Sequence, residues 1–131
     1  MIFIDSNIPM YVIGADHPLK AAARRAVEGA LAEDEVLCTD AEVFQEILHR
    51  YRAVGRPADI DAAFAALRGI IDVAYPIEIA DVERARRLLS TTPELSARDA
   101  LHVAVMQAHD VSRIMSFDRG FDGIPGLVRI E

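Results

Sequence analysis

The sequence contains a single cysteine, Cys38, and no long hydrophobic run. One cysteine excludes a disulfide bond within the chain, and a small thiol in the apolar stretch VLCT fits a reducing compartment. No apolar run approaches the roughly 18 residues that a membrane-spanning helix needs. The N-terminal run has no basic start and is interrupted by Asp5, which is not typical of a signal peptide. We therefore expect a cytoplasmic protein with no membrane partner.

Lysine is nearly absent as well, because 13 of the 14 basic residues are arginines, and the net charge is −7. A negative net charge by itself argues against a nucleic-acid partner, since phosphates are bound by positive surfaces. Arginine, however, binds phosphate oxygens better than lysine, because its guanidinium is a planar fork of donors. Arginine-rich codon usage would produce the same bias. Acidic residues that bind a divalent cation also stop acting as net negative charge. The charge composition therefore leaves a nucleic-acid partner open.

Repeats, low-complexity tracts and linkers are absent, and 131 residues with 52% hydrophobic composition suit one folded domain over residues 1–131. Strands are predicted at residues 1–5, 36–39, 72–77, 112–117 and 127–130. Helices are predicted at residues 7–14, 18–33, 40–55, 58–71, 80–90 and 97–110. Strands separated by helices predict an α/β fold, with a central parallel sheet flanked by helices on both faces. The run ALHVAVM is apolar nearly all round, so we expect the last helix to be deeply packed.

Two acids follow apolar strands directly. Asp5 ends the strand at residues 1–5, and Asp118 follows the strand at residues 112–117. Ligands of parallel α/β sheets bind in the crevice beyond the carboxyl ends of the strands, where both side chains are expected. Each acid has a structural alternative, because Asp5 can cap the next helix and Asp118 can be a turn residue among nearby glycines. Since Ser6 and Asn7 can also cap that helix, Asp5 is free for another role.

The helix at residues 40–55 carries two glutamates whose expected roles differ. Thr39 to Glu42 matches the capping box S/T-x-x-E, which assigns Glu42 a structural role at the helix start. The apolar stripe of this helix consists of Val43, Phe44, Ile47, Leu48 and Tyr51. Glu46 lies about 40° around the helix from Glu42, on the side nearer Val43, and so borders the buried stripe. The structural alternative for Glu46 is a solvated position on the polar face.

The fourth acid is Asp99, at the start of the last helix. Ser96 to Asp99 resembles a capping box with Asp in place of Glu, which is the structural alternative for this acid. Since the helix that follows is apolar, we expect its N-terminus to open onto the same crevice. His102 lies one turn further on and is interpreted as a hydrogen-bonded core histidine. The four histidines have no zinc-like spacing and Cys38 has no partner, so no zinc site is predicted.

Four acids from separated segments can therefore converge at one crevice, namely Asp5, Glu46, Asp99 and Asp118. An all-oxygen ligand set of this kind suits Mg²⁺ or Mn²⁺. Two such ions about 3.5–4 Å apart can clamp the attacking and leaving oxygens of a phosphodiester. The residues alone predict a metal-dependent site for phosphoryl transfer.

The segments that carry these acids resemble, in order and spacing, the four acidic motifs of PIN-domain ribonucleases. They are FIDSN, TDAEVFQEILHRY, SARDALHVAVM and SFDRGFDGIPGL, and the match covers almost the whole chain. No single motif is specific, but the ordered set is. The similarity is greatest to the VapC-type toxins of bacterial and archaeal toxin–antitoxin pairs. The resemblance implies a three-layer PIN-like fold and an endoribonuclease that depends on Mg²⁺ or Mn²⁺.

The resemblance also implies roles for individual residues. Asp5 and Asp99 become the primary metal ligands, and Glu46 and Asp118 complete the acidic pocket, where a metal-activated water attacks phosphorus without a covalent intermediate. The supporting positions that the resemblance adds are Asn7, Thr39, Ser116 and Asp122.

Contacts to partners follow from the same resemblance. Arg98 and Arg119 flank two of the acids and are candidates for holding RNA phosphates, with a plain surface arginine as the alternative for each. The implied partners are an RNA substrate, a cognate VapB-type antitoxin and a second copy of the chain in a homodimer. The alanine-rich helices around residues 21–32 and 58–67 could supply the close-packing faces of such a dimer.

Other functions stay open at this point. An aspartyl phosphatase usually has Asp-x-Asp after its first strand and a later lysine, whereas position 7 here is Asn7 and the only lysine is Lys20. A non-catalytic, Mg²⁺-binding signalling domain needs a paired early acid and a late lysine, and both are absent. A housekeeping RNA-processing PIN nuclease outside any toxin pair also fits the sequence. A small antitoxin reading frame directly upstream would favour the toxin.

Overall fold

The centre of the molecule is a five-stranded parallel sheet, in a computed structural model that describes residues 1–131. The strands are β1 (Ile2–Ile4), β2 (Leu37–Asp40), β3 (Val73–Tyr75), β4 (Arg113–Met115) and β5 (Val128–Ile130). Their order across the sheet is β3-β2-β1-β4-β5. All five predicted strands are present, and β2 runs one residue further than predicted, to Asp40.

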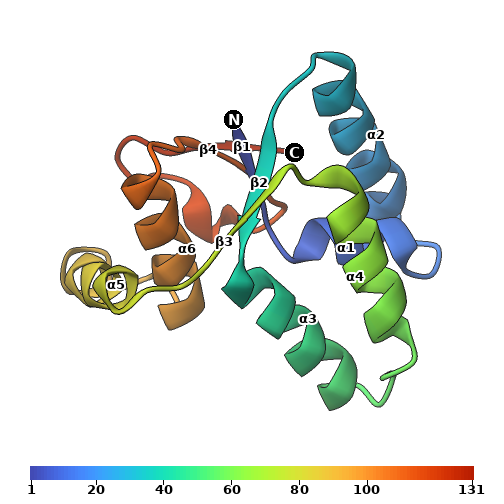
Figure 1. The fold of residues 1–131 in the computed structure, drawn as a ribbon, viewed down its shortest axis with the longest axis horizontal. Coiled ribbons are helices and arrows are strands. Elements are labelled where there is room, and N and C mark those ends of the chain that lie inside the picture. Colours follow the sequence, from blue (N-terminus) through green and yellow to red (C-terminus); the bar gives the residue numbers. More distant parts are fainter.

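Helices cover both faces of this sheet. They are α1 (Asn7–Ile13), α2 (Pro18–Ala32), α3 (Ala41–Ala53), α4 (Asp59–Ile70), α5 (Ile79–Thr91) and α6 (Ala97–Ala108), with a short 3₁₀ helix, η1 (Arg119–Phe121), after β4. Helices α5 and α6 pack together on one side of the sheet, and α1, α2 and α4 lie on the other, with α3 running from the end of β2 alongside α4 (Figure 1). The predicted three-layer α/β fold is confirmed.

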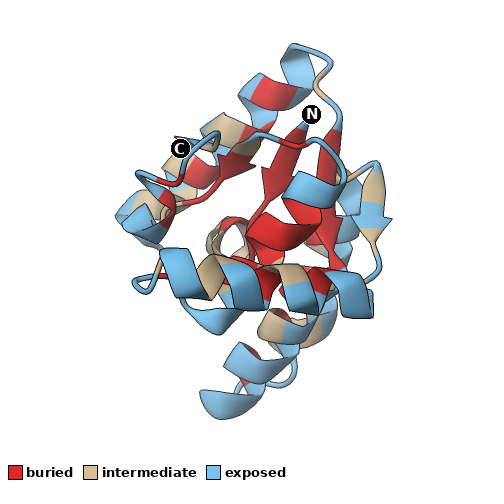
Figure 2. Ribbon diagram, turned by 90° about the vertical axis from the view of Figure 1, so that its left-hand side faces the viewer, coloured by how far each residue is buried: buried red, intermediate tan, exposed pale blue.

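The core is built around the middle strands. Phe3, Ile4 and Leu37 are fully buried, and Figure 2 shows the buried residues along these strands and on the helix surfaces that face them. The edge strands β3 and β5 are only partly covered. The expected deep packing of the last helix is confirmed, since α6 buries Ala100, His102, Val103, Ala104, Val105 and Met106.

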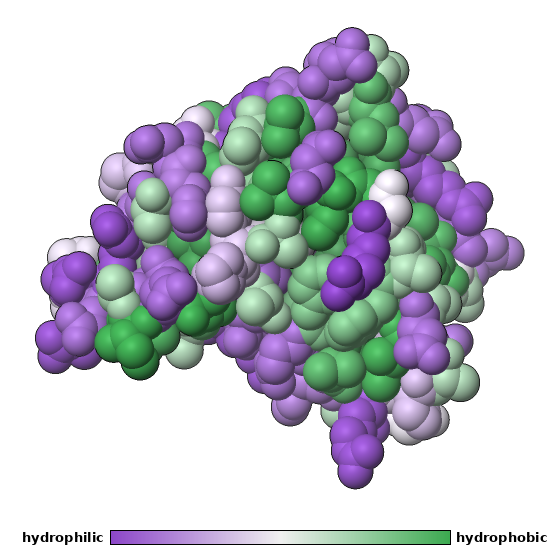
Figure 3. Space-filling model, viewed as in Figure 1, coloured by the Kyte–Doolittle hydropathy of each residue, from purple (hydrophilic) through white to green (hydrophobic).

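The surface mixes polar and apolar side chains. On the face seen in Figure 3, hydrophobic residues gather towards the middle of the view and hydrophilic residues dominate the rim. Ile79 of α5 is the most exposed of the large hydrophobic residues, at 76%. None of the helices combines the length and the apolar composition that crossing a membrane requires.

The register of the sheet brings three strand ends level with one another. Phe3 of β1 pairs with Cys38 of β2 on one side and with Ile114 of β4 on the other. Two residues further along, Asp5 therefore lies between the ends of β2 and β4. Polar residues at these ends are placed beside one another by the backbone alone, and the candidate site is built there.

Candidate metal centre

Asp5 is a buried carboxylate held by neutral donors. Its side chain accepts hydrogen bonds from the backbone N–H of Ser6 (2.7 Å), from Asn7 Nδ2 (2.9 Å) and from the hydroxyl of Ser116. Only 4% of the residue is exposed. Helix α1 begins after Ser6 and has no side-chain cap, so the capping alternative for Asp5 is wrong.

The environment of Asp5 disfavours its charged form. Burial raises the pKa of Asp5 from 3.8 to about 6, although the positive charge of His102 and the Ser116 hydrogen bond act in the opposite direction. No basic side chain is hydrogen-bonded to this carboxylate. A cation placed in the crevice would supply the missing compensation for a buried negative charge.

The start of helix α3 differs from the sequence prediction. The helix is capped by Asp40, whose side chain accepts the N–H of Val43 at 2.9 Å. Thr39 still belongs to β2, and its hydroxyl donates to the carbonyl of Ile4 at 2.9 Å, which ties β2 to β1. The predicted capping box between Thr39 and Glu42 is therefore wrong, because the strand extends through the position that the pattern assigned to the cap.

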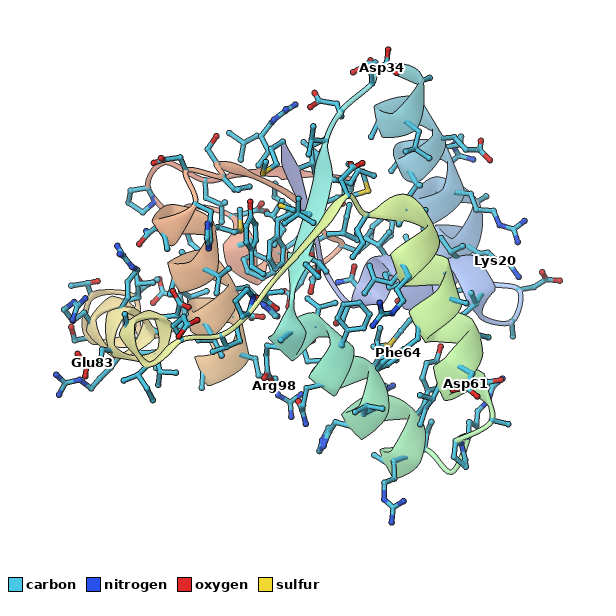
Figure 4. All side chains as sticks on the ribbon, viewed as in Figure 1. Lys20, Asp34, Asp61, Phe64, Glu83 and Arg98 are labelled. Atoms are coloured by element: carbon cyan, nitrogen blue, oxygen red, sulfur yellow. The ribbon has the colours of Figure 1, made fainter.

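Glu46 faces the crevice and Glu42 does not share its contacts. Glu46 accepts hydrogen bonds from Ser6 Oγ (2.6 Å) and makes a second hydrogen bond to His102 Nε2 (2.6 Å). Glu42 makes no side-chain hydrogen bond, and its one ion pair is with Arg98, at 3.9 Å. Figure 4 shows Arg98 near the start of α3, as this contact requires. The predicted border position of Glu46 is confirmed, with 14% of its side chain exposed against 21% for Glu42.

The buried stripe of α3 is narrower than predicted. Val43, Ile47 and Tyr51 are buried, whereas Leu48 is 44% exposed.

The pKa values of Glu42 and Glu46 are shifted in opposite directions by their surroundings. Burial raises the pKa of Glu42, and the nearby charge of Glu46 adds to this effect. Burial acts on Glu46 in the same direction, but the hydrogen bonds from His102 and Ser6 outweigh it and lower the pKa of Glu46.

His102 is indeed a hydrogen-bonded core histidine, but its partners are acids at the site. The residue is fully buried, and its Nδ1 lies 2.8 Å from Asp40 Oδ2 while its Nε2 contacts Glu46. Burial opposes the imidazolium, yet the two carboxylates outweigh it and raise the pKa of His102 well above 6.5. Asp40 is a site residue that the four predicted acids do not include, although it follows an apolar strand just as Asp5 and Asp118 do.

Asp99 lies at the rim of the same crevice. Ser96 caps α6 by accepting the N–H of Asp99 at 3.1 Å, and its hydrogen bond to the Asp99 side chain acts to lower the pKa of that carboxylate. Burial raises the pKa of Asp99, and the negative charges of Asp118 and Glu46 contribute to the rise. Mutual repulsion of this kind indicates that the three carboxylates share one region.

Asp118 and its neighbours are linked to Asp5 through a polar network. The N–H of Asp118 donates to Ser116 Oγ at 3.0 Å, and the same hydroxyl donates to Asp5. Asn7 joins this network through Ser116 (3.1 Å) and through the N–H of Phe117 (3.3 Å). Asp118 is exposed, and its side chain caps η1 by accepting the N–H of Gly120. The structural role expected for it as a turn residue is therefore present.

Asp122 reaches this network through Arg129, whose Nη1 donates to the backbone carbonyl of Ser116 at 2.9 Å. Asp122 is paired with Arg129 by hydrogen bonds of 2.7 and 3.2 Å, and no hydrogen bond joins it to the four acids. Arg119 is exposed on η1, directly after Asp118. The structure thus brings Asn7, Ser116 and Thr39 to the acids or their strands, and it connects Asp122 to Ser116 through Arg129.

Three of these side chains are close enough to hold one ion. One ligand atom each from Asp5, Glu46 and His102 lies within 4.8 Å of the other two, whereas Asp99 and Asp118 are not part of this group. Both nitrogens of His102 are already occupied by carboxylates. The donors that remain are therefore carboxylate oxygens, which fit a hard divalent cation such as Mg²⁺ or Mn²⁺.

Comparison with known proteins agrees with this geometry. The family model for the PIN domain matches residues 2–127. Ribonuclease VapC13 of Mycobacterium tuberculosis is 57% identical over 130 residues, which is 99% of each chain. The chain belongs to the VapC-type PIN-domain family. Ribonuclease VapC23 of the same species is 44% identical over 118 residues, covering 90% of this chain and 93% of its own.

Solved structures at low identity share the fold. The VapC20 structure from M. tuberculosis, a sarcin–ricin loop cleaving toxin, covers 91% of both chains with a TM-score of 0.74 at 22% identity. The VapBC2 structure from Rickettsia felis, bound to a DNA fragment from its promoter, covers 99% of this chain and 98% of its own, with a TM-score of 0.75 at 13% identity. The PIN-like architecture predicted from the sequence is confirmed.

The two glutamates of α3 offer a matched test of this PIN-domain site. Glu46→Gln should lower the rate of RNA cleavage about 10- to 100-fold, because it replaces a carboxylate at the crevice with a neutral amide. Glu42→Gln, one turn earlier on the same helix, should leave the rate near that of the wild type, since Glu42 makes no hydrogen bond to the residues of the crevice. Initial rates at saturating Mg²⁺ measure both effects. An inactive Glu42→Gln variant beside an active Glu46→Gln variant would reverse the assignment.

Metal binding should depend on pH through Asp5. Its pKa of about 6 lies above the usual range, so protons compete with a cation for this carboxylate below that pH. We expect the affinity for Mn²⁺ to fall roughly tenfold per pH unit below pH 6 and to level off above it. Isothermal titration calorimetry at pH 5, 6 and 7.5 measures the profile. An affinity that is flat from pH 5 to pH 7.5 is the contrary result.

Proposed function

We propose that this chain is a metal-dependent endoribonuclease, formed by a single PIN domain over residues 1–131, and the toxin of a VapBC-type toxin–antitoxin pair. The observation that carries the proposal is the crevice in which Asp5 and Glu46 lie together, with Asp99 at its rim. Similarity to VapC ribonucleases over nearly the full chain supports the same activity.

The metal is Mg²⁺ or Mn²⁺ in this proposal. Asp5 and Asp99 are its primary ligands, and Glu46 and Asp118 complete the acidic pocket. A bound divalent cation supplies a water of lowered pKa and stabilises the charge on the phosphate oxygens. The donor set fits such an ion, since Asp5 is a desolvated acid without a hydrogen bond from a basic side chain, and burial together with the charges of Asp118 and Glu46 disfavours the charged form of Asp99.

The remaining polar residues hold the acids in place. Ser6 and Asn7 donate to Glu46 and Asp5, and Ser116 connects Asp5 with the backbone of Asp118. The Thr39 hydroxyl donates to the carbonyl of Ile4, so it supports the acids indirectly, by fixing the backbone of β1 just before Asp5. This support leaves the ionised carboxylates oriented before substrate arrives, which is what an electrostatic site requires.

RNA contacts outside the acidic crevice are assigned to two arginines. Arg98 has 46% of its side chain exposed and lies beside Asp99 in the first turn of α6 (Figure 4). Arg119 is exposed beside Asp118. A guanidinium at each position can bind a phosphate on either side of the scissile bond. Both also counter the repulsion between an acidic protein and RNA.

The partners proposed for this chain are a VapB-type antitoxin and a second copy of the chain, and its compartment is the cytoplasm. The antitoxin is supported by the structural likeness to a VapBC complex. Ala23 of α2 and Ala63 of α4 are buried within the monomer, whereas Ala21, Ala62 and Ala65 are exposed, and these exposed alanines are available for contacts between chains. Exposed apolar residues such as Ile79 remain for contacts between chains. Co-purification with the product of a small upstream reading frame tests the antitoxin.

Cleavage of RNA by the purified protein tests the activity itself. We expect end-labelled RNA to be cut internally with Mg²⁺ or Mn²⁺ and to stay intact in EDTA. Because water is the nucleophile, products should lack a 2′,3′-cyclic phosphate, which attack by the ribose 2′-hydroxyl would leave. Cleavage that continues undiminished in EDTA, or that yields the cyclic phosphate, would contradict the proposal.

A further inference from the structure

A buried histidine joins the acidic crevice to the start of helix α3. Nδ1 of His102 lies 2.8 Å from Asp40 Oδ2, and its Nε2 lies 2.6 Å from Glu46 Oε1. We propose that His102 is a positioning residue that orients Glu46 for metal binding, with Asp40 as its anchor. This inference rests on the proposed function, because it assigns a role to a residue behind the metal site.

Asp40 is a rigid anchor. It is fully buried, and one of its carboxylate oxygens accepts the N–H of Val43 at the start of α3. The other oxygen faces His102. Asp40 is thus fixed by the end of β2 and by the helix that follows, and it has no rotameric freedom to follow a moving histidine ring.

The imidazole ring is fixed just as firmly. His102 lies on the buried face of α6, and its ring packs against Phe3 of β1 with a centroid distance of 5.4 Å. Since α6, β1 and β2 all belong to the core, the Nε2 atom is held at a set place. A hydrogen bond from that place selects one orientation of the Glu46 carboxylate.

Glu46 is the flexible member that needs such support. A glutamate side chain has three rotatable bonds, and ordering it costs conformational entropy that a fixed partner can offset. Ser6 Oγ holds Oε2 while His102 holds Oε1, so both oxygens are directed and each keeps a lone pair for a cation. Glu42, on the same helix, has no comparable partner.

The same contacts argue against His102 as a metal ligand itself. Both of its nitrogens form hydrogen bonds to carboxylates. Binding an ion through either nitrogen would break one of these bonds and leave Asp40 or Glu46 without its partner. Acting from behind a carboxylate is the arrangement by which outer residues orient metal ligands, and its loss typically costs 10- to 100-fold in metal affinity.

Two amide substitutions separate the two contacts of the ring. In His102→Asn the amide nitrogen lies close to the place of Nδ1, so it can satisfy Asp40 but cannot reach Glu46. In His102→Gln the amide nitrogen extends to about the place of Nε2 and can donate to Glu46. We expect Mn²⁺ affinity, measured by titration calorimetry, to fall about 10- to 100-fold in His102→Asn and to recover most of that loss in His102→Gln. Equal affinities in the two variants overturn the proposal.

A double-mutant cycle shows whether His102 acts through Glu46. His102→Asn should cause no further loss of Mn²⁺ affinity in the Glu46→Gln background, because the contact it serves is already changed. An additional loss as large as in the wild type overturns the proposal. Electron spin echo spectra of the wild-type protein with Mn²⁺ should show no directly coordinated imidazole nitrogen, and such a signal would also overturn it.

These results are distinguishable from a failure of the proposed function. If the wild type binds Mn²⁺ but does not cut RNA, the ribonuclease proposal fails while the affinity ratios still decide the role of His102. If the wild type cuts RNA and His102→Asn binds Mn²⁺ normally, only the positioning role fails. A wild type that binds no Mn²⁺ overturns both.

Discussion

Asp5→Asn and Asp99→Asn should each reduce RNA cleavage about 10³-fold or more while leaving the fold intact. Losing one metal-ligand charge removes several kcal/mol of transition-state stabilisation, which corresponds to a rate loss of about that size. The fold should survive because Asn keeps the shape of Asp. At position 99 the amide can still form a hydrogen bond with the Ser96 hydroxyl, and at position 5 the amide oxygen can still accept the N–H of Ser6.

Single-turnover cleavage rates with excess enzyme measure this loss, and circular dichroism confirms that each variant is folded. Asp61→Asn is the matched control, since Asp61 is exposed on α4 (Figure 4) and makes no hydrogen bond or ion pair through its side chain. Its rate should equal that of the wild type. Cleavage near the wild-type rate by purified Asp5→Asn protein with Mg²⁺ would contradict the assignment of Asp5 as a metal ligand.

The fold was predictable because each segment carried its own local signal. Apolar strands alternated with amphipathic helices, and that alternation specifies a parallel sheet with helices on both faces. Asp5 was predictable as a crevice residue for the same reason, since a strand end has a known place in such a sheet. Glu46 followed from helical geometry, which set it nearer than Glu42 to the buried stripe.

The misses have a common physical cause. The capping prediction at Thr39 failed because a four-residue pattern cannot show that β2 continues to Asp40. The bridge from Asp40 through His102 to Glu46 spans sequence separations of 62 and 56 residues. Contacts of that range exist only once the sheet and α6 have packed, so no local pattern reports them.

Removing the cation should destabilise the protein markedly. Asp5 and Glu46 lie together in the crevice, and Asp5 has a pKa of about 6 because burial disfavours its charged form. The folded metal-free protein therefore binds more protons at Asp5 than the unfolded chain between about pH 4 and pH 6. This contribution lowers the free energy of unfolding as the pH rises through that window. Above it, Asp5 stays charged and uncompensated until a cation binds.

Binding to the folded state alone offsets this deficit by mass action. Mn²⁺ at 100 times its dissociation constant should add about 2.7 kcal/mol to the free energy of unfolding. A change of about 1 kcal/mol moves the melting temperature of a domain of this size by a few degrees. The protein with excess Mn²⁺ should accordingly melt several degrees above the same protein in EDTA.

Differential scanning calorimetry of the wild type and Asp5→Asn, each with EDTA and with excess Mn²⁺ at pH 7.5, tests most directly whether the acidic crevice is the metal site. The wild type should show the full metal-induced shift. Asp5→Asn should show a much smaller one, and its metal-free form should melt at or above the wild-type temperature because a buried charge has been removed. A metal-induced shift of equal size in both proteins would mean that the cation binds elsewhere.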